Sequence, residues 1–301
     1  MIGYQQPNID PSEKRETALN RVFTCITEEN SSLNLSGLNL TSLPNLPEWI
    51  IKLDVSDNQL TRLPDELPKK LTHLLVGTNQ LTNLPEHLPE TLIELQVDCN
   101  NLVRLADNLP KGLVSLNASH NQLISLPNYL PERLSVLKAS DNKLTALPNK
   151  LPSLLTIMHV NKNNLESLPD NLPSYIYHLK ASDNPLIALP NKLPIKLEKL
   201  EVNGAFLTAL PNTMPDTLWF LDISNNQITG LPAKLPHRLQ ELRVDKNLLN
   251  RLPNQLPKML KMLSVASNQL DKLPDVLPDN LILLDASYNQ LKTLPEILPN
   301  K

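Results

Sequence analysis

Residues 53–73 read LDVSDNQLTRLPDELPKKLTH, and the following segment, residues 74–94, reads LLVGTNQLTNLPEHLPETLIE. Both segments place leucine, asparagine and proline at the same positions, and the pattern returns every 21 residues up to a last segment that begins at Leu284. The consensus is L-x-V-x-x-N-x-L-x-x-L-P-x-x-L-P-x-x-L-x-x, whose positions we number as columns 1 to 21. A fixed period of this length predicts a solenoid in which each repeat forms one coil.

The columns predict the path of each coil. Apolar residues in columns 1 and 3 alternate with period two, which is typical of a short strand with one buried face. Strands that recur at a fixed period stack into one parallel sheet. The asparagine of column 6 follows the strand, where its side chain can bond the backbone of its own and the neighbouring coil. The leucines of columns 8, 11, 15 and 19 are expected to fill the space between coils.

Prolines mark the return path of each coil. Column 16 is proline in all twelve segments from Leu53 onward, and column 12 is proline in eleven of them, with Ala106 as the exception. Because proline disfavours a helix, we expect an extended, polyproline-like return path. The predicted fold is therefore a leucine-rich-repeat solenoid, a horseshoe with a parallel β-sheet on its concave face and an extended convex side.

The chain is expected to divide into three parts. Residues 1–9 are predicted to be disordered, residues 10–32 to form a helical N-terminal cap, and residues 33–301 to form thirteen repeats of first 20 and then 21 residues. Asp10 would be the N-cap, with Pro11 at the first helical position and Glu13 completing a capping box. An apolar face of this helix is expected to cover the first repeat. It consists of Ala18, Leu19, Val22, Phe23 and Ile26.

Two places depart from the regular pattern. Ala205 stands where column 6 requires asparagine, so we expect a local weak point in the asparagine ladder there. The last repeat is followed by no cap, and we expect an uncovered core edge that a longer native chain, a dimer or a partner would cover. That edge consists of Leu284, Ala286, Leu291 and Leu294.

The composition narrows the classes of function. The chain has 28 basic and 31 acidic residues and a net charge of -3, so no nucleic-acid partner is expected, because phosphate binding needs clustered basic residues. No apolar run is long enough to span a bilayer, so no membrane insertion is expected. Without phosphate-loop, metal-binding or hydrolase motifs, we expect no cofactor, no metal and no enzyme activity. Cys25 is interpreted as a structural thiol.

The variable columns 21, 2, 4 and 5 are expected to point outward from the sheet and to carry partner specificity. In column 2, Lys138, His159 and Lys180 form a basic centre, and the acidic Glu201 and Asp222 follow it. A single surface charge contributes little, but this grouping favours a binding face. Aromatic residues anchor many interfaces, so Phe220 is either such an anchor or, with Trp219, part of the core. The candidate partner-binding residues are His120, Lys138, His159, Lys162, His178, Lys180, Glu201, Phe220, Asp222 and Arg243.

The repeats resemble the LPX-type leucine-rich repeats of bacterial type III secretion effectors, a family that includes the IpaH, SspH and SlrP ubiquitin ligases and the ligase-less scaffold YopM. The segments LDVSDNQLTRLPDELPKKL (53–71) and LDISNNQITGLPAKLPHRL (221–239) are similar to family repeats. Residues 13–44 are similar to the helix and first repeat that open the array. The resemblance implies a secreted, non-enzymatic module that binds host proteins on its concave face. It would act as a monomer or weak oligomer in the host cell cytoplasm, with the nucleus as a second destination.

The resemblance also implies an alternative, the substrate-recognition domain of a type III secreted E3 ubiquitin ligase whose catalytic domain is not in this chain. The ligase members use a cysteine in a C-x-D motif, whereas the two cysteines here stand in the sequences Cys25-Ile-Thr and Cys99-Asn-Asn. No catalytic residue is therefore expected in this chain. A third hypothesis, an extracellular receptor or adhesin module, predicts a signal peptide and cysteine-rich caps, and neither pattern occurs in this sequence.

Overall fold

The structure is a computed structural model that describes residues 12–295, so the predicted disorder of residues 1–9 lies outside the described residues. One helix, α1 (Arg15–Thr27), precedes thirteen strands of three residues each within the described range. The strands are β1 (Ser32–Asn34), β2 (Lys52–Asp54), β3 (His73–Leu75), β4 (Glu94–Gln96), β5 (Ser115–Asn117), β6 (Val136–Lys138), β7 (Ile157–His159), β8 (His178–Lys180), β9 (Lys199–Glu201), β10 (Phe220–Asp222), β11 (Glu241–Arg243), β12 (Met262–Ser264) and β13 (Leu283–Asp285).

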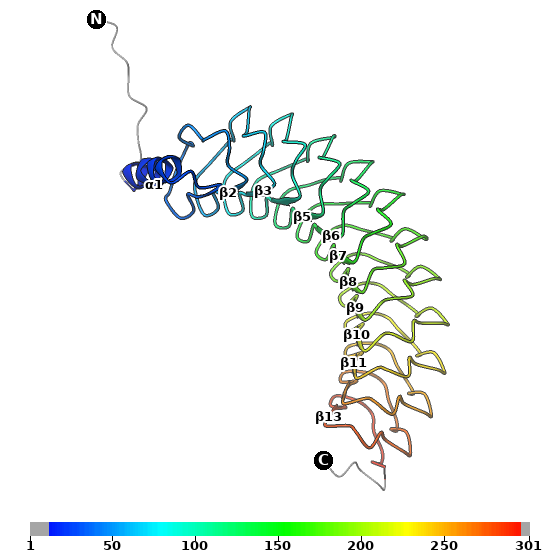
Figure 1. Cartoon of the computed structure of the whole chain (residues 1–301). Coiled ribbons are helices and arrows are strands. Elements are labelled where there is room, and N and C mark those ends of the chain that lie inside the picture. The colour runs from blue at the N-terminus through cyan, green and yellow to red at the C-terminus, as the bar shows by residue number, and fades with distance from the viewer. Residues whose placement is uncertain (1–11, 296–301) are drawn as a thin grey trace, which may run out of the picture. The chain divides into compact units, whose positions relative to one another are not determined.

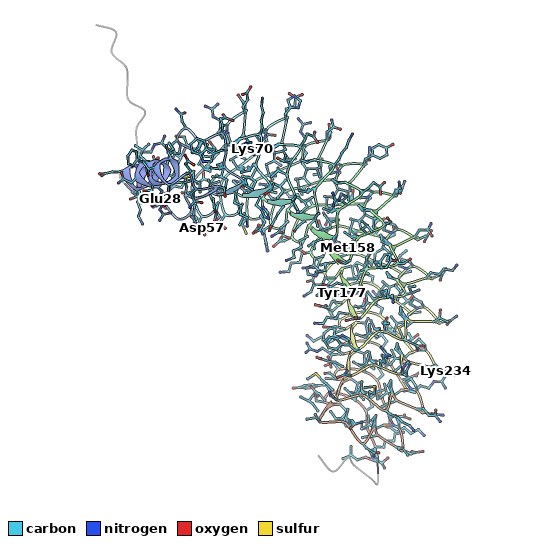
Figure 2. All side chains as sticks on the ribbon, viewed as in Figure 1. Glu28, Asp57, Lys70, Met158, Tyr177 and Lys234 are labelled. Atoms are coloured by element: carbon cyan, nitrogen blue, oxygen red, sulfur yellow. The ribbon has the colours of Figure 1, made fainter. Side chains whose placement is uncertain are left out.

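The chain forms two compact units, which are described separately. The first unit ends at Leu134 and holds α1 and the strands β1–β5, and the second unit starts at Ser135 and holds β6–β13. Within each unit the strands lie along one side of the coils and the return segments along the other (Figure 1). In the second unit, for example, Tyr177 lies on the strand side and Lys234 on the return side (Figure 2). Each unit is thus a solenoid of the predicted kind.

Neighbouring strands of a unit pair in parallel and in register, column on column. Leu53 of β2 pairs with Leu74 of β3, and Leu221 of β10 pairs with Leu242 of β11. From β1 to β12 the middle residue of each strand, in column 1, is buried, and the residues on either side are at least partly exposed. The strand therefore occupies columns 21, 1 and 2 and starts one residue earlier than the predicted strand. The buried column 3 residue follows it directly.

The predicted asparagine ladder is present. Asn79 is a typical member, because its Nδ2 donates to the carbonyls of Val55, Val76 and Gly77 at 3.0 to 3.2 Å. Its Oδ1 accepts the N–H of Leu60 at 2.9 Å. These bonds link each coil to the one before it and satisfy backbone groups that the turn would otherwise leave buried and unpaired.

The return path of the described coils is free of helix, as the prolines predict, and each coil closes it with a turn in which the column 19 N–H donates to the column 16 proline carbonyl, as Leu71 does to Pro68 at 3.1 Å. The only helix in residues 12–295 is α1, and the leucines of columns 8, 11, 15 and 19 point between the coils. In the segment from Leu53 these are Leu60, Leu63, Leu67 and Leu71, each at most 6% exposed. The core is aliphatic throughout and lies between the sheet and the return path.

The start of the helix differs from the prediction. α1 begins at Arg15, and its N-cap residue Lys14 makes no side-chain capping bond. Glu13 lies before the helix rather than in its first turn, and its carboxylate accepts hydrogen bonds from Thr41 Oγ1 and from the Arg15 guanidinium, both at 3.2 Å. The N–H of Lys14 donates to the carbonyl of Leu38 at 2.9 Å, which ties the chain to the first coil just before the helix begins. The predicted caps Asp10 and Pro11 lie outside the described residues.

The predicted apolar face of the helix is only partly correct. Ala18 and Val22 are buried, and the third buried residue is Cys25. Leu19, Phe23 and Ile26 are 52%, 67% and 46% exposed. Both sets have helical spacing, but the set with the smaller side chains allows the helix to approach the first coil closely. The Cys25 thiol donates to the carbonyl of Asn30 at 3.1 Å, and burial, with Glu28 nearby, raises the pKa of this thiol. It is a structural thiol.

The ladder is interrupted at Ala205, which is 6% exposed. In the regular coils the side chain at this column accepts the N–H of a column 8 leucine. Here the corresponding leucine, Leu186, donates instead to the carbonyl of Asn184 at 2.8 Å. The turn keeps one bond within the coil but loses the side-chain bonds between coils. At the other irregular place, the edge of the last repeat, Leu294 is 64% exposed, as expected.

Candidate functional site

Six of the candidate residues lie side by side on consecutive strands of the second unit. Column 2 is the last residue of each strand, and the pairing register places each member beside the next. We call this row the column 2 row. It consists of Lys138, His159, Lys180, Glu201, Asp222 and Arg243. All six are partly exposed, so the row forms part of the outward surface of the sheet, which we call the sheet surface.

A chain of polar contacts crosses three strands in this row. His159 Nε2 lies 3.3 Å from His178 Nδ1, and His178 Nε2 lies 3.1 Å from Glu201 Oε1. Lys180 Nζ reaches the same carboxylate oxygen at 3.1 Å. Because a carboxylate only accepts, His178 Nε2 carries the hydrogen of this bond. In a neutral His178, Nδ1 then accepts from His159 Nε2.

The surroundings of His159 in this series of polar contacts keep its imidazole neutral. Burial, followed by His178, Lys180 and Lys138, lowers the pKa of His159 to about 4, and Glu201 acts in the opposite direction. Burial raises the pKa of Glu201, but hydrogen bonds from His178 and Lys180 outweigh it, and the net effect is a lowered pKa. At neutral pH the row therefore presents two lysines on either side of an uncharged imidazole.

A second group of side chains brings two cations against two aromatic rings. Lys199 Nζ lies 4.6 Å from the centroid of the Trp219 ring, and the Arg243 guanidinium lies 5.5 Å from the centroid of Phe220. The two rings meet edge to face with centroids 5.9 Å apart. Arg243 Nε also donates to Glu241 Oε1 at 2.8 Å. We call Lys199, Trp219, Phe220 and Arg243 the aromatic cluster.

The structure brings together most of the candidate residues but not all of them. His178 and Phe220 belong to column 21 and lie beside the column 2 row, at the other end of strands β8 and β10. Lys162 lies in the turn after β7, where its φ of 54° and its N–H bond to Ser182 position the backbone of the turn. His120 has the same place in the turn after β5 and belongs to the first unit.

Sequence reasoning missed part of the aromatic cluster. Trp219 and Phe220 are both partly exposed, so the alternative of a core role is wrong. Lys199, a member of the cluster, and Glu241, which accepts a hydrogen bond from Arg243, are not among the candidate residues. They occupy column 21, like Phe220, and the column register would have placed them beside it. Trp219 belongs to column 20, which was not treated as outward.

The remaining chemistry of the described residues is limited. No group of three or more His, Cys, Asp or Glu side chains in residues 12–295 could hold a metal ion. The same part of the chain contains no helix with the length and apolar character needed to cross a membrane.

Short parallel strands, an asparagine ladder and a leucine core repeating every 21 residues define a leucine-rich-repeat protein. The family Leucine Rich Repeat matches residues 217–237, one coil of the second unit. Repeats of this kind build extended surfaces that bind other proteins.

Two solved structures are similar to this chain over nearly its whole length. YopM from Yersinia enterocolitica is 37% identical with a TM-score of 0.82, and the match covers 97% of this chain and 68% of that one. YopM from Yersinia pestis, a leucine-rich effector protein, is 33% identical with a TM-score of 0.75, and the match covers 97% and 93% of the two chains. The chain belongs to the leucine-rich-repeat family of these YopM proteins.

A shorter similarity connects the chain to a ligase. The E3 ubiquitin-protein ligase ipaH9.8 of Shigella flexneri is 50% identical over 62 residues, which are 20% of this chain and 11% of the ligase. The matched stretch thus spans about a tenth of the ligase.

Proposed function

We propose that this chain is the protein-binding module of a bacterial secreted effector, and that it binds a host protein in the host cell cytoplasm. The contact surface is the sheet surface of the second unit, and the observation that carries the proposal is the aromatic cluster. Tryptophan, tyrosine and arginine dominate the binding energy of protein interfaces. A coil whose fold needs only leucine, asparagine and proline has no structural use for two partly exposed aromatic rings held between two cations.

The column 2 row supplies the second half of the proposed surface. Lys138 presents a positive charge beside the neutral His159, Lys180 and Glu201 form an ion pair with each other, and Asp222 presents a negative charge next to this pair. Such a pattern selects a partner with the opposite order of charges and speeds the encounter with it. The aromatic cluster would provide most of the affinity, and the row would provide orientation.

The test compares capture of host proteins by three forms of the chain. Phe220→Ser removes one ring of the aromatic cluster from a partly exposed position, so the fold is expected to persist. We expect the amount of the captured partner, quantified by mass spectrometry, to fall at least about tenfold. Leu75→Ser is the matched control, because Leu75 is also partly exposed on a strand of the first unit. Equal capture by Phe220→Ser and the unaltered chain would remove the aromatic cluster from the proposal.

A second proposal for the same surface is that it selects substrates for an E3 ubiquitin ligase. The 50% identity to a stretch of ipaH9.8 favours this alternative. The intact mass of the natural secreted product separates the two proposals. A mass near 33.8 kDa would support the first proposal, a binding module without a ligase domain. A much larger product that transfers ubiquitin, and loses this activity when a cysteine outside these 301 residues is replaced, supports the ligase.

A further inference from the structure

One coil of the first unit departs from the proline pattern of the return path. Column 12 holds Ala106 in place of the proline found in the other eleven full-register repeats. A proline ring carries three side-chain carbons and alanine carries one, so the space of two carbon atoms is left open at this position. Leu84, in the preceding coil, is partly exposed. Leu63 and Leu105, which occupy the same column in the coils on either side, are each 4% exposed.

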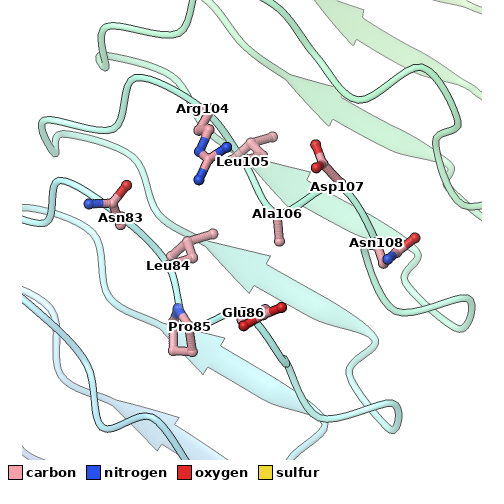
Figure 3. Close-up of a pocket in the computed structure, with 9 residues that line it drawn as sticks. All are labelled: Asn83, Leu84, Pro85, Glu86, Arg104, Leu105, Ala106, Asp107 and Asn108. Carbon is pink, nitrogen blue, oxygen red and sulfur yellow. The ribbon is translucent and has the colours of Figure 1, made fainter.

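A cleft of about 450 Å³ lies between the return paths of the two coils at this position. We call it the Ala106 cleft. The methyl group of Ala106 points into it beside Leu84, while Arg104 and Asp107 lie on one side and Pro85 and Glu86 on the other (Figure 3). Leu84, Pro85, Leu105 and Ala106 give the cleft a small apolar floor, and polar side chains provide the larger part of its lining.

The cleft also offers one backbone donor that the other full-register coils lack at this position. Ala106 has an N–H where proline has none, and this N–H has no hydrogen-bond partner among residues 12–295. Glu86, Arg104 and Asp107 are exposed at the rim, and none of the three takes part in an ion pair in the same range. The rim therefore presents two carboxylates and one guanidinium, a net negative charge.

We propose that the Ala106 cleft is a second protein-binding site, which takes a short extended segment of a partner with one aliphatic and one basic side chain. The aliphatic side chain fills the space of the missing proline ring and covers Leu84. A carbonyl of the segment accepts the N–H of Ala106, as in other sites that bind extended peptides. The basic side chain lies beside Glu86 and Asp107. The site belongs to the return path of the first unit and does not rest on the proposed role of the sheet surface.

The experiment titrates the full chain, labelled with ¹⁵N, with three acetylated and amidated pentapeptides. Gly-Lys-Leu-Lys-Gly carries both features of the expected segment, Gly-Lys-Ser-Lys-Gly lacks the aliphatic side chain, and Gly-Glu-Leu-Glu-Gly reverses the charge. We expect the first peptide to shift the amide resonances of Leu84, Leu105 and Ala106. The other two peptides should bind roughly fivefold more weakly, since one apolar contact or surface charge pair contributes about 1 kcal/mol. Equal affinity for all three peptides would overturn the proposal. Shifts of amide resonances outside the Ala106 cleft, with none at Leu84, Leu105 or Ala106, would overturn it as well.

Ala106→Pro is the decisive variant, because it restores the residue that eleven other repeats carry in the same column. It fills the cleft and removes the N–H, and we expect binding of Gly-Lys-Leu-Lys-Gly to weaken at least about tenfold, with no decrease in melting temperature. Ala106→Ser keeps the N–H and the space, so its affinity should stay within about twofold. Unchanged binding by a folded Ala106→Pro variant would exclude the cleft.

A further variant keeps the proposal testable if the proline form folds poorly. Glu86→Gln combined with Asp107→Asn changes only exposed groups, and we expect binding of the basic peptide to weaken about threefold to fivefold. Unchanged binding would contradict the charge selection. Phe220→Ser should leave peptide binding as it is, so a failure of this proposal and a failure of the proposed function are distinguishable.

Discussion

The two units have the same interior and present different surfaces. Leu95 of β4 and Leu221 of β10 are both fully buried, and Asn79 and Asn226 are 9% and 8% exposed and make the same set of ladder bonds. Outward, the first unit presents scattered charges on β2 to β4 and the uncharged Ser115 and Asn117 on β5. In the second unit, β6 to β11 carry the column 2 row and the aromatic ring of Phe220. Stability and the proposed recognition therefore depend on different columns, and substitutions can change one without the other.

The largest expected effect on stability comes from a substitution in the interior that both units share. Leu147, in column 11 of the second unit, is 8% exposed, and Leu147→Asp would bury a carboxylate without a partner. We expect a loss of about 4 kcal/mol in the free energy of unfolding, measured with urea, and local unfolding of the adjacent coils. Leu126→Asp, at the same column of the first unit, should cost a similar amount.

Thr145→Asp is the control for this change, because Thr145 is exposed in the same coil. Its free energy of unfolding should stay within about 0.5 kcal/mol of the unaltered chain. A normal melting curve for Leu147→Asp would contradict the assignment of column 11 to the core.

The next effect concerns the ladder. Asn226 donates to three carbonyls and accepts the N–H of Leu207 at 2.9 Å. Asn226→Ala leaves these buried groups short of partners, and we expect a loss of about 2 to 3 kcal/mol in the free energy of unfolding. Asn79→Ala in the first unit should give the same loss, and Gln227→Ala, at an exposed position, should give almost none. Clearly unequal losses at the two asparagines would show that the interiors are not equivalent.

A smaller effect belongs to the surface of the second unit alone. The pKa of His159 is about 4, below the value of about 6.5 for an unfolded histidine. The folded chain therefore binds fewer protons between these values, so the stability from neutral His159 is complete above about pH 6.5 and is lost as the pH falls toward 4. We expect this loss to be about 1 to 2 kcal/mol, because His159 is only partly buried and solvent screens the effect.

His159→Gln tests this assignment, because glutamine keeps a donor toward His178 and does not titrate. Urea unfolding at pH 7 and at pH 4.5 should show a smaller decrease in stability for this variant than for the unaltered chain. In Lys138→Gln, one of the positive charges near His159 is removed, so the pKa of His159 should rise in an NMR titration. An unchanged pKa would show that Lys138 does not act on the imidazole.

The fold could be predicted from the sequence because its constraints are local and repeated. One period of 21 residues indicates the strand, the ladder and the helix-free return path, and each further repeat confirms the same assignment. The helix was harder to predict. Its two apolar stripes have the same spacing, and the contact of Lys14 with Leu38, which is distant in sequence, decides where the helix begins.

The candidate site was predictable in part for the same reason. The register alone places Lys138, His159 and Lys180 side by side. The contacts of His178 with Glu201 and of Lys199 with Trp219 join different columns on different strands, and they depend on side-chain rotamers. A column-by-column reading does not contain that information. The Ala106 cleft lies at the single exception in column 12, which is visible in the sequence although the geometry of the cleft is not.

The smallest expected effect comes from a substitution that restores the asparagine ladder in the irregular coil of the second unit. Ala205→Asn restores the column 6 side chain, whose Oδ1 would compete with the carbonyl of Asn184 for the N–H of Leu186. The gain in the free energy of unfolding should be about 1 kcal/mol or less, because Leu186 already has a partner and only the bonds between coils are new. Urea unfolding measures it against Asn226→Ala as the opposite change. A loss of stability would mean that the turn at Gly204, with its φ of 67°, has adapted to alanine and leaves no room for the ladder.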